Sequence, residues 1–322
     1  MTIVTIRDAA RRSSASIAVA QGFNCFDFQT ELTPGERVTV LAAADGFASG
    51  GQRPSHSGIP LLFPFPNRIR DGKYSWNGQS YELPADLVAH DANGHAIHGF
   101  ALDRPWRIID QTSDSVTGEF QISVDAPERS PLWPTDGRIR IRYRLHESCL
   151  RADIEVHNPS DHPLPWGFGT HGYFRIPLSS QGQPGDCTVY APVRQCWKLD
   201  QCLPDGTLIE PAEGADLTES PWFDTLKLDN VYTDIILEDG ISTCRIIDER
   251  GGLELQQRSS ADFREIVAFT PPWTSAVCLE PYTCVTDAIN LQQRGIDAGL
   301  QVLAPHATWL GRIDLEVLPL VS

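Results

Sequence analysis

Strict alternation of apolar and charged residues between positions 138 and 157 constrains the fold of this chain more than any other feature. In residues 138–145, RIRIRYRL, arginine occupies every even position and Ile, Tyr or Leu every odd one. Residues 150–157, LRADIEVH, repeat the alternation with carboxylates among the polar positions. A period of two is typical of a β-strand with one buried and one polar face. The two segments therefore predict an antiparallel hairpin in which the arginines face carboxylates, which favours the pairing modestly.

Strand signals of the same kind recur along the chain and are separated by turn residues. They fall at residues 16–28, 37–42, 74–83, 233–270 and 308–318. Asn77-Gly78 predicts a tight hairpin turn, and Asp239-Gly240 and Gly251-Gly252 predict the turns of a meander. The best helix signal, residues 286–293, is short. Because strands and long helices do not alternate, the sequence predicts an all-β fold, a large antiparallel β-sandwich with few short helices.

Length, charge and cysteine spacing set the broad class. No linker, composition shift or repeat divides the chain, so residues 1–322 are expected to form a single domain. A formal net charge of −16 argues against nucleic acid or an anionic membrane as a partner. The N-terminus lacks an apolar signal segment, and no stretch approaches a membrane-spanning helix. The eight cysteines are scattered singly, which favours buried thiols in a reducing cytoplasm over a zinc ribbon.

Residues 167–172, GFGTHG, match the G-x-G-x-x-G pattern of dinucleotide-binding loops. That pattern binds a dinucleotide only where a strand precedes it and a helix opens within it. Here the aromatic, β-prone segment 173–177 follows and ends at a proline. The sequence therefore argues against a nicotinamide site.

Four short stretches carry polar groups that a purely structural explanation leaves open. Arg68 follows the rigid Phe63–Pro66 segment, His98 precedes Gly99, and His171 lies among glycines. Residues 276–279 predict a buried strand with Glu280 at its end, where partial desolvation raises the pKa of the carboxyl group and makes it a better base. Taken singly, each has an ordinary explanation: a loop hydrogen bond for a histidine, a surface ion pair for Arg68, a backbone contact for Glu280.

Taken together, these stretches resemble the aldose 1-epimerase (galactose mutarotase-like) family. The similarity covers residues 58–290 and runs in order through PLLFPFPNRIRDGKYSWNGQSYEL, IHGFALDRPW, WPTDGRIRIRYRL, THGYFRIP, LDNVY and CLEPYTCVTDAINL. The resemblance implies a galactose mutarotase-like supersandwich with an open sugar-binding cleft on one sheet. It also implies a small-molecule sugar as partner, with no metal and no cofactor; the oligomeric state is left open.

Residue by residue, the resemblance implies that Glu280 and His171 are catalytic. His98, Arg68 and Asp229 are implied to bind the substrate, Asp229 on the shortest of the six motifs. The implied enzyme is an isomerase, a mutarotase of carbohydrate metabolism that interconverts the α and β anomers of a free aldose. Removing a proton from the C1 hydroxyl while protonating the ring oxygen opens the ring, and a carboxylate base with an imidazolium acid suffices for both transfers.

Two departures from the family pattern leave the substrate open. Many galactose mutarotases carry Asn at the positions of Gly169 and Arg175, so galactose is not implied here. Arg175 with Arg68, Arg70 and Arg53 could form a basic rim for a sugar phosphate, as in hexose-6-phosphate 1-epimerases, although solvated arginines on an acidic surface are the simpler explanation.

The sequence is also compatible with a non-catalytic carbohydrate-binding protein on the same fold. A glycosidase would need two carboxylates flanking the scissile bond, and Glu280 is the one clear candidate. Phe174 and Trp273 are candidates for stacking on the sugar, with core packing as the ordinary role of such residues.

Overall fold

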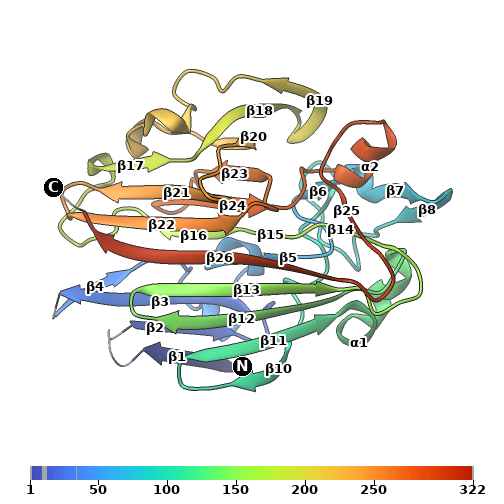
Figure 1. The fold of residues 1–322 in the computed structure, drawn as a ribbon, viewed down its shortest axis with the longest axis horizontal. Helices are drawn as coiled ribbons and strands as arrows, with labels where there is room; N and C mark the ends of the chain where they lie inside the picture. Colours follow the sequence, from blue (N-terminus) through green and yellow to red (C-terminus); the bar gives the residue numbers. More distant parts are fainter. Residues whose placement is uncertain (1, 9–12, 34, 321–322) are drawn as a thin grey trace.

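The computed structural model describes residues 2–8, 13–33 and 35–320. Within this part of the chain, nearly all regular structure is β, and neighbouring strands of every sheet pair antiparallel (Figure 1). Two eight-stranded sheets and one four-stranded sheet make up the body of the molecule. The predicted all-β sandwich with few short helices is therefore confirmed.

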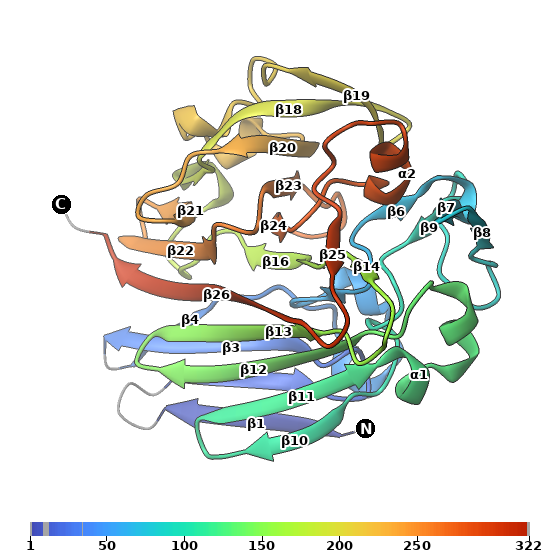
Figure 2. The ribbon, with the colours of Figure 1, turned by 45° about the vertical axis from the view of Figure 1, so that its right-hand side comes forward.

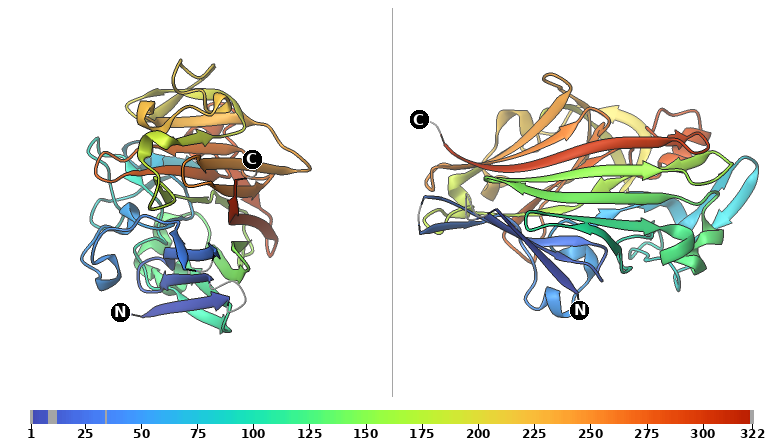
Figure 3. Two further views of the ribbon diagram at one scale, coloured as in Figure 1. Left: turned by 90° about the vertical axis from the view of Figure 1, so that its left-hand side faces the viewer. Right: turned by 60° about the horizontal axis from the view of Figure 1, so that its bottom comes forward.

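The first eight-stranded sheet carries the long central strand of the molecule, β26, which runs beside β13 and β22. Figure 3 shows this C-terminal strand, in red, along the length of the green strands. In spatial order the sheet contains β10 (Arg107–Gln111), β11 (Ser115–Gln121), β12 (Arg138–His146), β13 (Cys149–His157), β26 (Thr308–Pro319), β22 (Leu253–Ser260), β21 (Ile241–Asp248) and β17 (Cys187–Tyr190).

The second eight-stranded sheet lies on the other side of the core (Figure 2). In spatial order it contains β19 (Leu203–Ile209), β18 (Val193–Asp200), β20 (Asp229–Ile235), β23 (Glu265–Phe269), β24 (Ala276–Tyr282), β15 (Gly169–Thr170) and β5 (Leu61–Leu62), while β16 (Gly172–Arg175) also pairs with β24. The four-stranded sheet contains β1 (Ile3–Asp8), β2 (Ser13–Ala18), β3 (Asn24–Thr33) and β4 (Glu36–Thr39).

Three small strand pairs and several short helices complete the described residues. The paired strands are β6 (Arg68–Ile69) with β9 (Ala96–Ile97), β7 (Lys73–Trp76) with β8 (Gln79–Glu82), and β14 (Leu164–Trp166) with β25 (Gln301–Leu303). The α-helices are α1 (Ile122–Asp125) and α2 (Ala288–Gln293), and the 3₁₀-helices are η1 (Phe47–Ser49), η2 (Pro54–His56), η3 (Arg70–Gly72), η4 (Pro127–Leu132), η5 (Pro184–Asp186), η6 (Leu217–Glu219) and η7 (Phe223–Thr225). No helix of the described residues is long and apolar enough to cross a membrane.

The alternating segments at 138–157 form the predicted hairpin of β12 and β13. Its odd-numbered residues on β12 are buried, and Arg140 faces Glu155 while Arg142 faces Asp153. The pattern of opposite charges does not extend to the end of the hairpin, because Arg144 faces Arg151. Arg151 turns instead to Asp314 on β26, with Nε 2.8 Å from Oδ1. A third strand thus supplies the carboxylate that the hairpin itself lacks.

The predicted meander at 233–270 is wrong in one respect. A tight turn does form at Asp239-Gly240, with φ of 51° and 77°, and β21 and β22 do pair across the turn at Gly251-Gly252. However, β20 and β23 (Glu265–Phe269) belong to the second sheet and β21 and β22 to the first, so the chain crosses the sandwich between β20 and β21 and returns between β22 and β23. Alternation fixes the buried face of each strand but leaves its partner open, because both sheets offer the same apolar interior.

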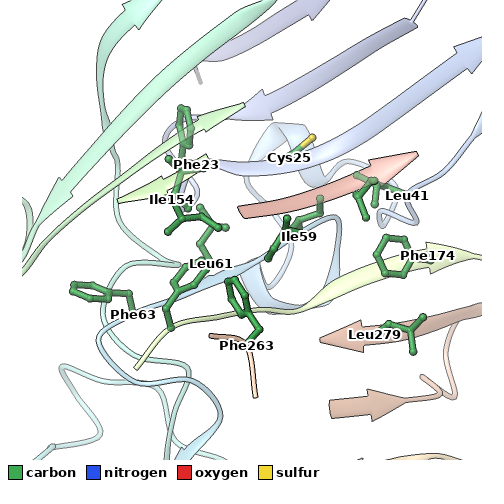
Figure 4. Close-up of a cluster of buried hydrophobic side chains, with 14 of the residues drawn as sticks. Phe23, Cys25, Leu41, Ile59, Leu61, Phe63, Ile154, Phe174, Phe263 and Leu279 are labelled. Carbon is green, nitrogen blue, oxygen red and sulfur yellow. The ribbon is translucent and has the colours of Figure 1, made fainter. Parts of the chain in front are cut away.

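One cluster of buried hydrophobic residues joins all three large sheets. Figure 4 shows Cys25 of β3, Ile154 of β13 and Leu279 of β24 directed into the same interior. Phe174 of β16 lies in this cluster and is 1% exposed, so core packing, rather than sugar stacking, is its role. The shared core supports the expectation of one domain over 1–322, which stays a prediction.

Candidate active site

Strand register brings His171 and Glu280 together on the second sheet. Gly169 pairs with Tyr282 and Gly172 with Leu279, so the intervening His171 lies directly opposite Glu280 on β24. Nδ1 of His171 is 3.3 Å from Oε1 of Glu280. The segment then continues as strand β16 instead of opening a helix, so GFGTHG lacks the helix that a dinucleotide-binding loop requires. A carboxyl group and an imidazole more than 100 residues apart in sequence thus lie side by side.

Glu280 is more deeply buried than the sequence suggested. The sequence pattern predicts a partly desolvated residue at the end of a strand, whereas β24 continues through Pro281 to Tyr282 and is buried throughout. The Glu280 side chain is 2% exposed, and Oε2 accepts a hydrogen bond from the Tyr282 hydroxyl. Burial raises the pKa of Glu280 well above its ordinary value, against the opposing effects of the Tyr282 hydrogen bond and the Arg68 charge.

The His171 imidazole is held by neighbouring rings. It stacks on Tyr173 with the ring centroids 4.8 Å apart, and His98 meets it edge-on at 5.5 Å. Burial lowers the pKa of His171 to about 3. Its Nδ1 lacks the alignment of a hydrogen bond to Glu280 despite the short distance, so among the described residues this buried nitrogen has no hydrogen-bond partner.

The small strand pair of β6 and β9 brings His98 beside the acid–base pair. Arg68 pairs with Ile97, and the His98 amide donates to the Asn67 carbonyl at 2.7 Å. His98 adopts a φ of 69°, an uncommon conformation for a residue with a side chain, which the surrounding hydrogen bonds must hold. Burial is the main cause that lowers its pKa well below the ordinary value. Its Nδ1 is buried and has no hydrogen-bond partner within the described ranges, so its hydrogen-bonding capacity is unmet.

Arg68 is paired with a carboxylate, and its charge also affects the pKa of Glu280. Its Nε is 2.7 Å from Oδ2 of Asp91, and its Nη1 donates to Asn67 at 2.8 Å. The guanidinium is nevertheless close enough to oppose the rise in the pKa of Glu280. Arg68 therefore sits at the site in a fixed orientation, held by Asp91 and Asn67.

Asp229 lies at the edge of the same face. It opens β20, pairs with Phe269 on β23, and is exposed. Its charge adds to the rise in the pKa of Glu280, which burial mainly causes. The Cys202 thiol donates to Oδ2 of Asp229 at 3.8 Å. Asp229 is thus exposed at the surface, whereas Glu280 is buried.

His56, Tyr282 and Tyr173 also contact groups of this site, although no sequence pattern singles them out. His56 stacks on the half-exposed Trp273 with centroids 4.5 Å apart, and it lines a cleft of about 690 Å³ together with His98 and Arg53. The Tyr173 hydroxyl donates to the Ser55 carbonyl at 2.8 Å and so ties the His56 segment to the ring that supports His171. An isolated histidine such as His56 gives no sequence signal that it lines a cleft.

The suggested basic rim is largely neutralised. Arg68 pairs with Asp91, and Arg70 lies 3.7 Å from Asp287. Arg175 is exposed and lines a separate hollow with Asp27 and Asp45. Of the four arginines, Arg53 alone is an exposed cation that lines the cleft beside His98.

One group of residues has the donor types of a metal site. His171, Cys278 and Glu280 have donor atoms within 4.8 Å of one another. Zinc bound by such donors at about 2.0–2.3 Å would hold them roughly 3.5 Å apart, so the cluster is too widely spaced as it stands. Burial also raises the pKa of both Cys278 and Glu280, so two protons would have to be displaced. We assign this group no metal.

Comparison with known proteins places this geometry in a family. A model of the aldose 1-epimerase family matches residues 30–316. The Escherichia coli K12 protein YihR is 25% identical over 239 residues, which cover 74% of this chain and 72% of that protein. A galactose mutarotase-like protein from Clostridium acetobutylicum is 22% identical, covers 99% of both chains and superposes with a TM-score of 0.84.

A homologue of GalM/aldose epimerase from C. elegans has the same fold, with 16% identity, 99% of both chains covered and a TM-score of 0.82. These structures share the sandwich of antiparallel sheets described above. The family match spans most of the chain and includes every site residue named here. The chain therefore belongs to the aldose 1-epimerase family.

Proposed function

We propose that this protein is an aldose 1-epimerase, a mutarotase that interconverts the α and β anomers of a free aldose by acid–base chemistry. The observation that carries the proposal is the 3.3 Å approach of His171 Nδ1 to Glu280 Oε1, next to His98, which lines a cleft of about 690 Å³. His98 has a free buried nitrogen beside this pair. A carboxyl group and an imidazole are the two proton carriers that ring opening needs.

The reaction needs two proton transfers in each direction. Ionised Glu280 removes the proton of the C1 hydroxyl, and protonated His171 delivers one to the ring oxygen, so that the C1–O bond breaks and an aldehyde forms. After rotation about the C1–C2 bond, His171 recovers its proton from the ring hydroxyl and Glu280 returns its proton to the carbonyl oxygen. Protein and solvent exchange no net protons, because the pair starts and ends with one. Since burial lowers the pKa of His171 and raises that of Glu280, this proton resides mainly on Glu280, and the reactive form, with the proton on His171, is the minor one.

Substrate positioning follows from the groups around the pair. The free Nδ1 of His98 and the fixed guanidinium of Arg68 can each bind a sugar oxygen. Asp229 can accept a bond from a hydroxyl at the rim, and the half-exposed ring of Trp273 offers an apolar surface. These roles support a free aldose, which presents hydroxyls and one apolar face.

Activity should show a bell-shaped dependence on pH, because the active pair holds one proton. Burial lowers the pKa of His171 to about 3, so a second proton joins the pair only in acid. Burial raises the pKa of Glu280, so the last proton leaves only at a pH well above the ordinary carboxyl range. We expect kcat/KM to rise through the lower of these values and to fall through the upper one. The two limits belong to the coupled pair. If activity already decreases as the pH rises through the ordinary carboxyl range, this assignment is wrong.

Exchange NMR at C1 tests the function and the substrate together. Anomer exchange should accelerate for at least one free aldose, and more strongly than for its 6-phosphate, because three of the four rim arginines are paired or lie outside the cleft. A preference for the 6-phosphate that is lost in Arg53→Gln would instead favour a hexose-6-phosphate as the substrate. Saturable sugar binding without faster exchange would leave only a binding protein.

Two further assignments belong to this proposal. All eight cysteines are free and six are buried, which supports a reducing compartment such as the cytoplasm. A glycosidase is not favoured, since it needs two carboxyl groups flanking one bond, and here Glu280 is buried while Asp229 is exposed at the rim. The reaction as written requires neither a metal nor a cofactor.

A further inference from the structure

Glu280 is held by a residue that the proposed chemistry does not use. The Tyr282 side chain is completely buried, and its hydroxyl donates to Oε2 of Glu280 two residues earlier on the same strand. Both side chains lie on the same face of β24, because residues two apart on a strand share a face. The hydrogen bond occupies Oε2, so Oε1 is the oxygen that faces His171.

The backbone opposite Tyr282 makes room for its ring. Gly169 pairs directly with Tyr282, and a Cβ atom at Gly169 would lie 2.1 Å from Cδ1 of the tyrosine. No side chain fits there without displacing the ring. Gly169 is thus complementary to Tyr282, and this contact explains why a residue so close to His171 is a glycine.

We propose that Tyr282 is a positioning residue for the acid–base pair: its buried hydroxyl fixes Glu280 through Oε2 and directs Oε1 toward His171 and the sugar. This inference rests on the proposed function, because it assigns Tyr282 a task in the same reaction. As a charge-assisted hydrogen bond, the contact is stronger when Glu280 is ionised, so Tyr282 also favours the form of Glu280 that removes a proton.

The other charged and titratable groups around Glu280 come from several elements of the fold. Arg68 lowers the pKa of Glu280 and Asp229 raises it, while Cys278 and Tyr173 are close enough to be affected by its charge. His171 lies opposite on the neighbouring strand. Within the described residues, none of these groups donates a hydrogen bond to the Glu280 carboxylate, whereas Tyr282 does. Removing the Tyr282 hydroxyl should therefore raise the pKa of Glu280 without altering any formal charge.

Tyr282→Phe should move the titration of Glu280 to higher pH by about one to two units, the size expected for the loss of a hydrogen bond to a charged group. The ring still fills the space beside Gly169, so the fold should be kept. The titration is read from the ¹³Cδ resonance of Glu280 in protein labelled at glutamate, assigned by its absence in Glu280→Gln. In parallel, the plateau of kcat/KM should fall about tenfold, and the alkaline limb should move to higher pH.

Tyr232→Phe is the matched control, since Tyr232 is another fully buried tyrosine whose hydroxyl donates to a backbone carbonyl, that of Ala215, at 2.6 Å. It should leave both the Glu280 resonance and the pH profile unchanged. If Glu280 titrates at the same pH in Tyr282→Phe as in the wild type, or if activity falls equally at every pH, Tyr282 has only a packing role and the inference fails. The NMR titration needs no substrate, so it decides the inference even if no sugar is turned over.

Discussion

Glu280→Gln should lower kcat for anomer exchange by about 10³-fold, within the range of 10²–10⁴ typical of one positioned acid–base group, while the affinity for sugar changes little. Glutamine keeps the shape of the side chain and can still accept the hydrogen bond from Tyr282. It cannot carry the proton of the C1 hydroxyl. Rate is measured by polarimetry or by exchange NMR, and affinity by calorimetry with the same sugar.

Glu265→Gln provides the control for burial. Glu265 is a second fully buried glutamate, on β23 beside β24, and its Oε2 accepts a hydrogen bond from Trp197 at 2.9 Å. Burial raises its pKa to about 8, so it resembles Glu280 in environment. It pairs with Tyr282 in the ladder, but its own hydrogen bond goes to Trp197 and not to His171 or Glu280. Glu265→Gln should keep kcat within a few-fold of the wild-type value. An unchanged rate in Glu280→Gln would instead mean that Glu280 has only a structural role.

The sequence predicted those parts of the structure that local pattern determines. The alternation at 138–157 indicated β12 and β13 with the correct faces, and Asn77-Gly78 indicated the hairpin of β7 and β8. The pattern has a period of two because one side of each strand faces the shared core and the other does not. The resemblance to a family then identified His171 and Glu280, which the register of β15, β16 and β24 brings together.

Features that depend on contacts between distant segments could not be predicted in this way. Glu280 was expected at the end of a strand because a proline follows it, yet β24 continues to Tyr282. Its depth comes from being enclosed by β23 on one side and β15 and β16 on the other. The role of Tyr282 was equally hidden, since a tyrosine after a proline is an ordinary strand residue until Gly169 is placed opposite it.

The local sequence pattern also could not predict which charged residues pair with each other. Arg68 looks the same in sequence whether it binds a sugar or a surface carboxylate, and the structure shows that Asp91, 23 residues later, fixes it at the site. The crossing of the chain from β20 to β21 has the same origin, because both sheets contribute apolar faces to one core. In each case the residue type is compatible with several partners, and only the fold selects one.

His171→Asn should lower kcat by about 10²–10³-fold and change the shape of the pH profile. Asparagine cannot be protonated, so the acid limb set by His171 disappears. Glu280 must then be ionised unaided, and because burial raises its pKa, the remaining activity should increase with pH instead of forming a bell. A variant that keeps both the wild-type rate and the bell shape would remove His171 from the mechanism.

The double variant tests whether the two groups act as one unit. Glu280 gains a proton from the sugar in the same step in which His171, 3.3 Å away, gives one to it, so each is useful only in the presence of its partner. Residues that act in this way show strongly non-additive effects. Glu280→Gln combined with His171→Asn should therefore be no more than a few-fold slower than Glu280→Gln alone. If the two losses multiply instead, the groups act independently, and the single shared proton on which the proposed reaction depends does not exist.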